Sequence, residues 1–196
     1  MSDSILYMSM SLDGFIAGAN DGPDNGLGDG GDVLHAWLNT SGDTSPPRFD
    51  PEGESRRVFD EIFATGAAVV GRKMFDYAGQ WGGDHHDDIP IFVPTRGEPP
   101  EPISENVHYV TDGLESAMRQ AKQAAGESDV MVHGAELAQS LLRARVLDKL
   151  EISLVPVLLG SGRRLFNGLD DEDIELEIER VLEAPGVTHV RYRVAS

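Results

Sequence analysis

The chain has 196 residues, of which 40% are hydrophobic and 26% charged, and its 16 Lys and Arg against 34 Asp and Glu give a net charge of −18. This composition predicts one globular domain over residues 1–196, and the negative field argues against a nucleic-acid partner because it repels phosphate backbones. The absence of cysteine excludes disulfides and thiolate chemistry, and the lack of a long apolar run or a signal-peptide start predicts a cytoplasmic protein with no membrane segment.

The N-terminal quarter of the chain predicts one strand and then a long irregular segment. Residues 5–10 are typical of a strand, and Asp13-Gly14 is a turn signal. Residues 18–53 are rich in Gly, Asp, Asn and Pro and are interrupted only by a short predicted helix over 32–38. A long irregular segment inside a compact domain is usually functional or mobile.

The middle of the chain alternates helical and extended patterns. The predicted helices have apolar residues at three- and four-residue spacing, and the predicted strands are short apolar runs. In chain order the predicted elements are a helix over 54–66, a strand over 67–70, a helix from Arg72, strands over 89–95 and 107–111, a helix over 112–126, a strand over 129–134, a helix over 135–146 and a strand over 149–160.

The C-terminal segment changes to a period of two. Residues 174–184 and 187–195 alternate apolar and polar side chains around the turn Pro185-Gly186, which predicts an antiparallel hairpin with one solvated face. Alternating strands and helices followed by a hairpin predict an α/β fold in which the sheet is mostly parallel and ends in an antiparallel edge.

Three corners at the ends of predicted strands carry residues suited to phosphate binding. They are Gly71-Arg72-Lys73, Thr95-Arg96 and the stretch 133–137, in which a strand enters a helix through small residues. Ligands of open α/β sheets lie beyond the carboxyl ends of the strands, where helices present free N–H groups. Three such corners indicate a ligand with more than one phosphate, although GxGxxG and GxxxxGK[ST] motifs are absent.

Four motifs resemble the dihydrofolate-reductase-like superfamily. They are MSLDGFIAG, VVGRKMFD, VHGAELAQSLL and LEISLVPVLLGSGRRLF. The similarity is greatest to the reductase domain of bacterial riboflavin biosynthesis and its stand-alone relatives. It implies a three-layer α/β/α fold with a central, mostly parallel sheet. It also implies a homodimer that reduces a small pteridine-like or ribosylamino-pyrimidine-like heterocycle with NADPH.

The resemblance implies roles for particular residues in cofactor binding. It places Gly71, Arg72 and Lys73 at the 2′-phosphate side of NADPH, and Thr95 and Arg96 beside the adenosine phosphate. The remaining cofactor positions are Gly134, Ala135, Glu136 and Leu137 at the pyrophosphate and Ser9, Ile16 and Ala17 beside the nicotinamide. His133 stands where the family often has a first glycine of a pair, so its side chain either narrows the pyrophosphate groove or points away from it.

Two carboxylates are candidates for the catalytic proton donor. Asp13 lies in the turn near the expected substrate site, where it can equally serve only to build the turn. Asp32 lies roughly where the folate reductases have a buried carboxylate, and helix capping explains it equally well. By resemblance, Ser153 is expected near the substrate ring, and Arg163 is expected to reach a substrate phosphate.

An alternative function is a ligand-binding or interaction module that has kept the fold and lost catalysis. The missing unambiguous acid and the residue at 133 favour this alternative. We expect no metal site at the acidic stretch 84–88, because consecutive residues rarely converge on one ion. For Trp37 and Trp81, we expect a role in the core or in a dimer interface rather than stacking on a ligand, and a lid over the ligand is an alternative for Trp81.

Overall fold

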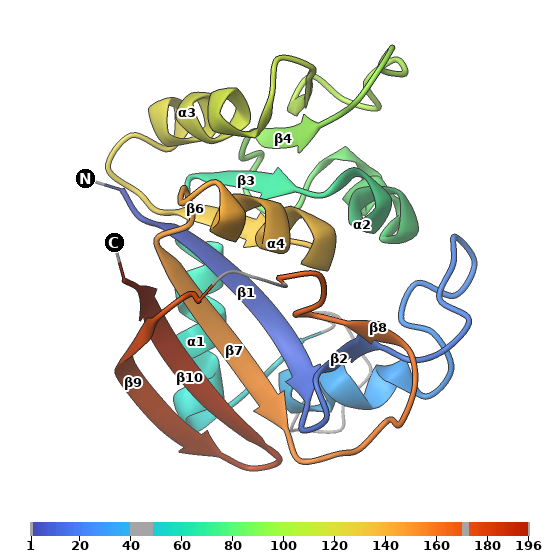
Figure 1. Ribbon diagram of the computed structural model, residues 1–196, viewed down its shortest axis with the longest axis vertical. Helices are drawn as coiled ribbons and strands as arrows, with labels where there is room; N and C mark the ends of the chain where they lie inside the picture. The colour runs from blue at the N-terminus through green and yellow to red at the C-terminus, as the bar shows by residue number, and fades with distance from the viewer. Residues whose placement is uncertain (1, 40–48, 170–172, 196) are drawn as a thin grey trace.

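The computed structural model describes residues 2–39, 49–169 and 173–195, and its centre is one eight-stranded sheet (Figure 1). The strand order is β5-β4-β3-β6-β1-β7-β10-β9. The first six strands in this order run parallel, and β10 and β9 complete the sheet as an antiparallel hairpin. The strands are β1 (Ser4–Ser11), β3 (Ala67–Val70), β4 (Ile91–Pro94), β5 (Val107–Val110), β6 (Val130–His133), β7 (Lys149–Val155), β9 (Leu176–Ala184) and β10 (Val187–Val194).

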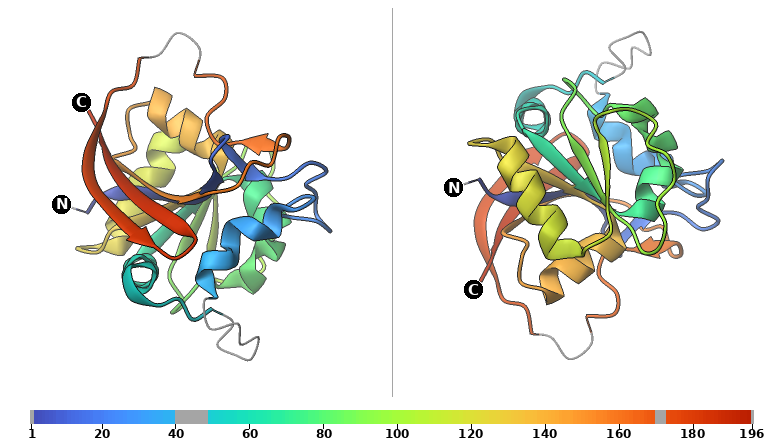
Figure 2. Two further views of the ribbon diagram at one scale, coloured as in Figure 1. Left: turned by 90° about the horizontal axis from the view of Figure 1, so that it is seen from below. Right: turned by 90° about the horizontal axis from the view of Figure 1, so that it is seen from above.

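Helices cover both faces of the sheet, as the two end-on views in Figure 2 show. The helices α3 and α4 lie on one face, and α1 lies on the other. The elements are η1 (Gly31–Leu38), α1 (Gly53–Phe63), α2 (Arg72–Tyr77), η2 (Gly79–Gly83), α3 (Leu114–Ala125) and α4 (Ala135–Arg143), where η denotes a 3₁₀ helix. In the described part of the chain, no helix is both long and apolar enough to cross a membrane.

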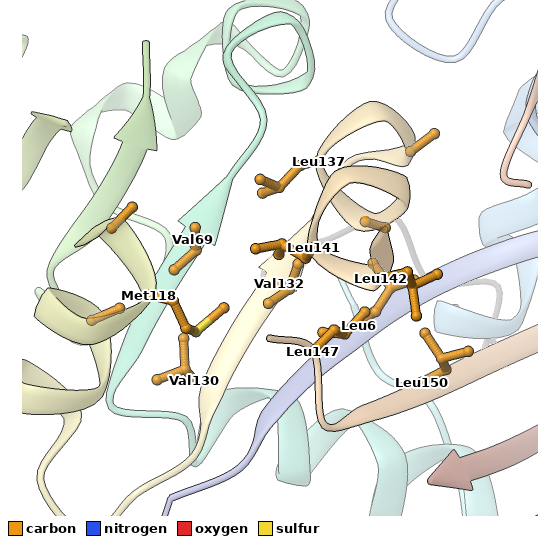
Figure 3. Close-up of a cluster of buried hydrophobic side chains, with 14 of the residues drawn as sticks. Leu6, Val69, Met118, Val130, Val132, Leu137, Leu141, Leu142, Leu147 and Leu150 are labelled. Atoms are coloured by element: carbon orange, nitrogen blue, oxygen red, sulfur yellow. The ribbon is translucent and has the colours of Figure 1, made fainter. Parts of the chain in front are cut away.

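Alternation along the strands produces two separate cores. Leu6, Val132 and Leu150 point to the face covered by α4 and pack with Leu141 and Leu142 (Figure 3). The residues adjacent to these on the same strands point to the opposite face, because successive strand side chains alternate between faces. Tyr7 and Met131 accordingly pack with Phe75 of α2 on the opposite face. The parallel strands are therefore buried on both sides, as their continuous apolar runs predict.

The predicted α/β arrangement is confirmed, with the mostly parallel sheet and the closing hairpin in the predicted order. The strand predicted over 149–160 is wrong in its second half, because β7 ends at Val155. Pro156 follows, and it has no N–H for the sheet. The predicted irregular segment 18–53 includes residues 40–48, which lie outside the described residues.

A small second sheet was not predicted from the sequence. It pairs β2 (Phe15–Ala17) with β8 (Arg163–Arg164) in an antiparallel arrangement. The two strands are so short that neither has a detectable period, and they come from opposite ends of the chain. This pairing holds the loop after β7 over the segment that follows β1.

Candidate functional site

A cavity of about 1230 Å³ opens at the carboxyl ends of β1, β3 and β6. This is the edge of the sheet at which an α/β fold is expected to bind its ligand. All the residues predicted to bind cofactor or substrate line it. They are Ser9, Ile16, Ala17, Gly71, Arg72, Lys73, Thr95, Arg96, Gly134, Ala135, Glu136, Leu137, Ser153 and Arg163. The sequence prediction therefore selected residues that the fold brings together.

Two of the predicted phosphate corners are in direct contact. The backbone N–H of Gly71 donates to the carbonyl oxygen of His133 at 3.0 Å. Gly134 has a φ of 107°, and a Cβ built on it would lie 3.3 Å from the Cβ of Met74 and 3.5 Å from the nitrogen of Gly71. Glycine is favoured there by the backbone angle, and a Cβ would also lie tightly against the Met74 side chain.

The cations of this part of the cavity differ in how they are paired. Nε of Arg72 donates to Asp76 at 2.7 Å, and its guanidinium lies 5.2 Å from the ring centroid of Tyr109. Its terminal nitrogens have no hydrogen bond among the described residues, and neither Lys73 nor Arg96 forms an ion pair there. Three cationic groups are thus available to an anion in a chain with a charge of −18.

Arg163, in contrast, is already occupied by carboxylates. Its Nε donates to Asp21 at 2.8 Å, and a second nitrogen of the same guanidinium also donates to Asp21. Nη1 lies 3.6 Å from a carboxylate oxygen of Glu136. The predicted contact of Arg163 with a substrate phosphate would have to compete with both carboxylates.

Two serines stand side by side in the cavity wall. Ser9 of β1 and Ser153 of β7 are paired in the sheet register. The Ser9 hydroxyl accepts a hydrogen bond from Nε1 of Trp37 at 2.9 Å, so its own proton is free to donate. Ser153 is hydrogen-bonded to Nδ1 of the buried His189 at 2.9 Å, and Nε2 of that ring is 3.1 Å from the hydroxyl of Ser55. These contacts fix both hydroxyls.

The side chain of His133 points away from α4 and towards the other face of the sheet. Its neighbour Val132 packs in the core under α4, so alternation directs residue 133 to the opposite face. Its ring centroid lies 5.8 Å from that of Trp81 and 5.9 Å from that of His85. His133 therefore leaves the N-terminus of α4 open, which resolves the alternative that the sequence left open.

The histidines of the cavity are neutral. Burial lowers the pKa of His133 to about 4, and the neighbouring His35 adds to this effect. Burial also lowers the pKa of His85 to about 3, with further contributions from His133 and His86. The pKa of His35 is lowered by burial as well, partly offset by Asp32. Each of these rings is therefore a neutral hydrogen-bonding group rather than a cation near pH 7.

Neither candidate for the proton donor lines the cavity. Asp13 accepts hydrogen bonds from Ser11 at 2.6 Å and from the backbone N–H groups of Leu159 and Gly160 at 3.1 and 2.7 Å. These contacts, with the Ser11 bond first, lower the pKa of Asp13, so it holds no proton near neutral pH. The geometry supports an anchoring role, in which Asp13 ties the turn after β1 to the loop after β7.

Asp32 lies on the exposed side of η1. It is in the first turn of this helix and not at its N-cap position, which is occupied by Gly30, so the capping explanation is wrong. Its one described influence on the cavity is the charge that it places near His35. A catalytic role for Asp32 stays a prediction.

Sequence reasoning missed the aromatic lining of the cavity. Trp37 is buried in a core with Leu34 and Val155, as expected, but it also lines the cavity. Trp81 lines the cavity as well. The further rings that line it and were not predicted belong to Tyr7, His35, Phe49, Phe59, Phe63, Tyr77 and His85. The one local signal was the glycine-rich surroundings of Trp81, because glycines at 79, 82 and 83 indicate an unusual backbone.

Comparison with known proteins supports the fold. A structure named "Putative riboflavin biosynthesis protein" from Shewanella sp. PV-4 superposes with a TM-score of 0.73 at 22% identity, over 99% of each chain. A deaminase/5-amino-6-(5-phosphoribosylamino)uracil reductase from Thermotoga maritima gives a TM-score of 0.65 at 13% identity, over 99% of this chain and 57% of its own. The dihydrofolate-reductase-like fold with a C-terminal hairpin is thereby confirmed.

Sequence comparison identifies the family. The protein YwjB of Bacillus subtilis (strain 168), whose name describes it as uncharacterized, is 26% identical over 171 residues, covering 86% of this chain and 85% of that protein. The family model described as the RibD C-terminal domain matches residues 4–190. Since this match spans nearly all of the sequence, the chain belongs to the RibD C-terminal domain family.

Proposed function

We propose that this protein is an NADPH-dependent reductase of a small heterocycle. The observation that carries the proposal is the cluster of available cations at a cavity next to two touching glycine corners. Arg72, Lys73 and Arg96 are the residues that would contact phosphate groups, and Gly71 and Gly134 leave the backbone open to a close approach. The membership of a reductase family gives the reaction class.

The described residues fit a dinucleotide with a 2′-phosphate. The N-terminus of α4 begins at Ala135, directly after Gly134, and offers free N–H groups to a pyrophosphate. The planar guanidinium of Arg72 can donate two parallel hydrogen bonds to a phosphate. Lys73 is exposed and lies 5.4 Å from the ring of Tyr77, beside the same corner.

NADPH, when bound, supplies the hydride. The task of the protein is then to bind the acceptor ring and to hold its polar edge. Ser9 and Ser153 lie at the paired positions of β1 and β7 and would orient that edge, because both hydroxyls are held by buried partners. Trp37 and the other rings of the wall would exclude water from the reacting face.

A second candidate function is ligand binding without catalysis. It is favoured by the position of Asp13 and Asp32, neither of which lines the cavity. The two functions differ in turnover and not in binding. A non-catalytic module would bind NADPH, and its NADPH would stay unoxidised in the presence of heterocycles that bind the same cavity.

The proposal is tested by calorimetric titration of Lys73→Gln and Arg96→Gln with NADPH. Each variant removes a cation that has no carboxylate partner, and each is expected to weaken NADPH binding about tenfold. Arg145→Gln is the matched control, because Arg145 is exposed, forms no ion pair among the described residues and does not line the cavity. Unchanged NADPH affinity in both cavity variants would overturn the assignment of the cofactor site.

A further inference from the structure

The aromatic rings on one side of the cavity form a connected wall. We call this wall the aromatic end, and it consists of Phe59, Phe63, Trp81, His85 and His133. The centroid distances are 4.4 Å between the two phenylalanines, 6.0 Å from Phe63 to His85, 4.5 Å from His85 to Trp81 and 5.8 Å from Trp81 to His133. The rings come from α1, from the segment after α2 and from β6. Such a surface suits a flat ring, which gains from both burial and ring contacts.

The strained backbone around Trp81 directs the indole side chain into the cavity wall. Five consecutive residues from Gly79 to Gly83 have φ between 49° and 90°. Trp81 itself has a φ of 49°, an angle that large side chains rarely adopt. Strain of this kind persists where the surroundings enforce it, and it is concentrated at functional sites. Here it places an indole in the cavity wall, against His85 and Phe75.

Among the described residues, one cation lies over a ring of the aromatic end: the Arg56 guanidinium is 5.8 Å from the Phe59 ring centroid, but it is ion-paired with Asp50 and does not line the cavity. Arg72 lies against Tyr109, whereas Lys73 and Arg163 lie against Tyr77. None of the cavity cations lies over a ring of the aromatic end. Instead, the exposed carboxylate of Asp84 lines the cavity beside Trp81. Among the described residues, this end therefore offers a phosphate a carboxylate and no unpaired cation, whereas the cationic corners attract a phosphate.

The cation that could have served a substrate phosphate is neutralised. Arg163 makes a two-nitrogen contact with Asp21 and also faces Glu136. The remaining polar groups at the aromatic end are neutral imidazoles. Nδ1 of His133, and Nδ1 of the neighbouring His35 outside the aromatic end, have no hydrogen-bond partner among the described residues. A buried polar atom without a partner is costly, and the polar edge of a nitrogen heterocycle could supply one.

We propose that the aromatic end takes a flat, uncharged nitrogen heterocycle that carries no phosphate group. This inference rests on the proposed function only in calling that ring the substrate of the reductase. Phosphate recognition is then confined to the cofactor corners, and substrate selection follows ring shape and neutral hydrogen bonding. The cationic corners and the aromatic end divide the cavity between two ligands of different charge.

Two matched pairs of probes test the inference. The two members of each pair share the same ring and differ by one phosphate group. The pairs are riboflavin with flavin mononucleotide, and neopterin with neopterin monophosphate, titrated by tryptophan fluorescence in the absence of NADPH. The unphosphorylated member of at least one pair is expected to bind at least about tenfold more tightly than its partner. Equal or tighter binding of the phosphorylated members, or no binding of any of the four probes up to about 1 mM, would overturn the inference.

Variants test the ring contacts of the aromatic end and the role of Arg163. Trp81→Ala and Phe63→Leu should each weaken the unphosphorylated probe about tenfold, through loss of ring contacts. Asp21→Asn should strengthen the phosphorylated probe alone, because it releases Arg163. The matched control is Asp24→Asn, which makes the same charge change at an exposed position outside the cavity lining. No gain in Asp21→Asn, or an equal gain in Asp24→Asn, would contradict the role assigned to Arg163.

A parallel NADPH titration separates this inference from the proposed function. Binding of NADPH without preference for the unphosphorylated rings would refute the inference and leave the reductase assignment standing. The reverse result, ring binding with the expected preference and no NADPH binding, would refute the reductase assignment and leave the ring site standing.

Discussion

The backbone N–H of Gly71 donates to the carbonyl oxygen of His133 at 3.0 Å, which joins the corner after β3 to the corner after β6. The bond continues the pairing of β3 and β6 at their carboxyl ends, where β3 leads into α2 and β6 leads into α4. It sets Gly71 against Gly134 at the mouth of the cavity. The spacing of the two corners, on which dinucleotide binding depends, is thus a consequence of the sheet register.

Replacement of Gly134 by alanine is expected to weaken NADPH binding and to destabilise the fold. The new Cβ would meet Met74 and Gly71, and a φ of 107° strains any side chain. The expected loss of stability is about 1 kcal/mol or more, measured by urea unfolding. Gly126→Ala is the matched control, because its φ of 64° is strained as well but nothing lies within 4 Å of the new Cβ. Equal NADPH affinity in the two variants would contradict a cofactor role for the corner.

Replacement of Glu151 by glutamine is expected to loosen the contact between α1 and the C-terminal hairpin. Glu151 is fully buried on β7 and accepts hydrogen bonds from Arg180 and Arg191, which also bind Glu61 of α1. Removing the charge leaves two partly buried guanidinium groups with only the carboxylate of Glu61 between them. The expected loss is about 3 kcal/mol in the free energy of unfolding.

The control for this change is Glu177→Gln on the exposed edge strand β9. If both variants unfold at the same urea concentration as the parent protein, the buried network does not stabilise the fold. A loss confined to Glu151→Gln, without change in NADPH affinity, is the expected pattern because the cofactor corners lie elsewhere.

Acid is expected to destabilise the protein through its buried histidines. The ordinary pKa of 6.5 falls to about 4 for His133 and to about 3 for His85, so the unfolded chain takes up these protons before the folded chain does. The contribution of these two histidines to the free energy of unfolding is therefore fully present above about pH 6.5, and it decreases as the pH falls towards 4. Each histidine should account for about 2 kcal/mol between about pH 7 and 5.

Urea unfolding at these two pH values measures the effect in the parent protein and in His133→Asn. The variant should lose less stability on acidification, because one of the titrating groups is gone. His108→Asn is the control, since His108 is exposed on β5. A pH dependence that is identical in the parent protein and His133→Asn would contradict the assigned environment of His133.

Replacement of Asp13 by alanine is expected to lower the melting temperature. Its carboxylate holds the N–H groups of Leu159 and Gly160, and these lose their acceptor in the variant. An anchoring role predicts a change in thermal unfolding together with a change in turnover. Turnover that disappears while the melting temperature is unchanged would instead assign Asp13 to proton transfer.

The sheet and its helices could be predicted from the sequence because their signals are local. Short apolar runs, helical spacing and a glycine at each corner placed β3, β6 and α4 within a few residues of their observed bounds. The cationic corners followed for the same reason, since parallel strands bring their carboxyl ends to one edge. The end of β7 at Val155 is likewise explained locally, by Pro156, although the apolar run beyond it concealed the boundary.

The aromatic end and the role of Asp13 could not be predicted from the sequence, because they depend on contacts between residues that are far apart in the chain. Phe63, Trp81 and His133 come from three segments, and Trp81 is presented by a left-handed run of backbone. Asp13 is bound by Gly160, which is 147 positions away in the sequence. Arg163 was expected to be free for a ligand, and its pairing with Asp21 likewise joins distant parts of the chain.

The central claim is that the cationic corners select a phosphorylated dinucleotide. A fluorescence titration of the intact protein with NADPH and NADH tests it most directly, with Arg72→Ala measured in parallel. We predict saturable binding of NADPH at least about tenfold tighter than that of NADH, and loss of this preference in the variant. Equal affinity for the two nucleotides, or no binding of either up to about 1 mM, would contradict the claim.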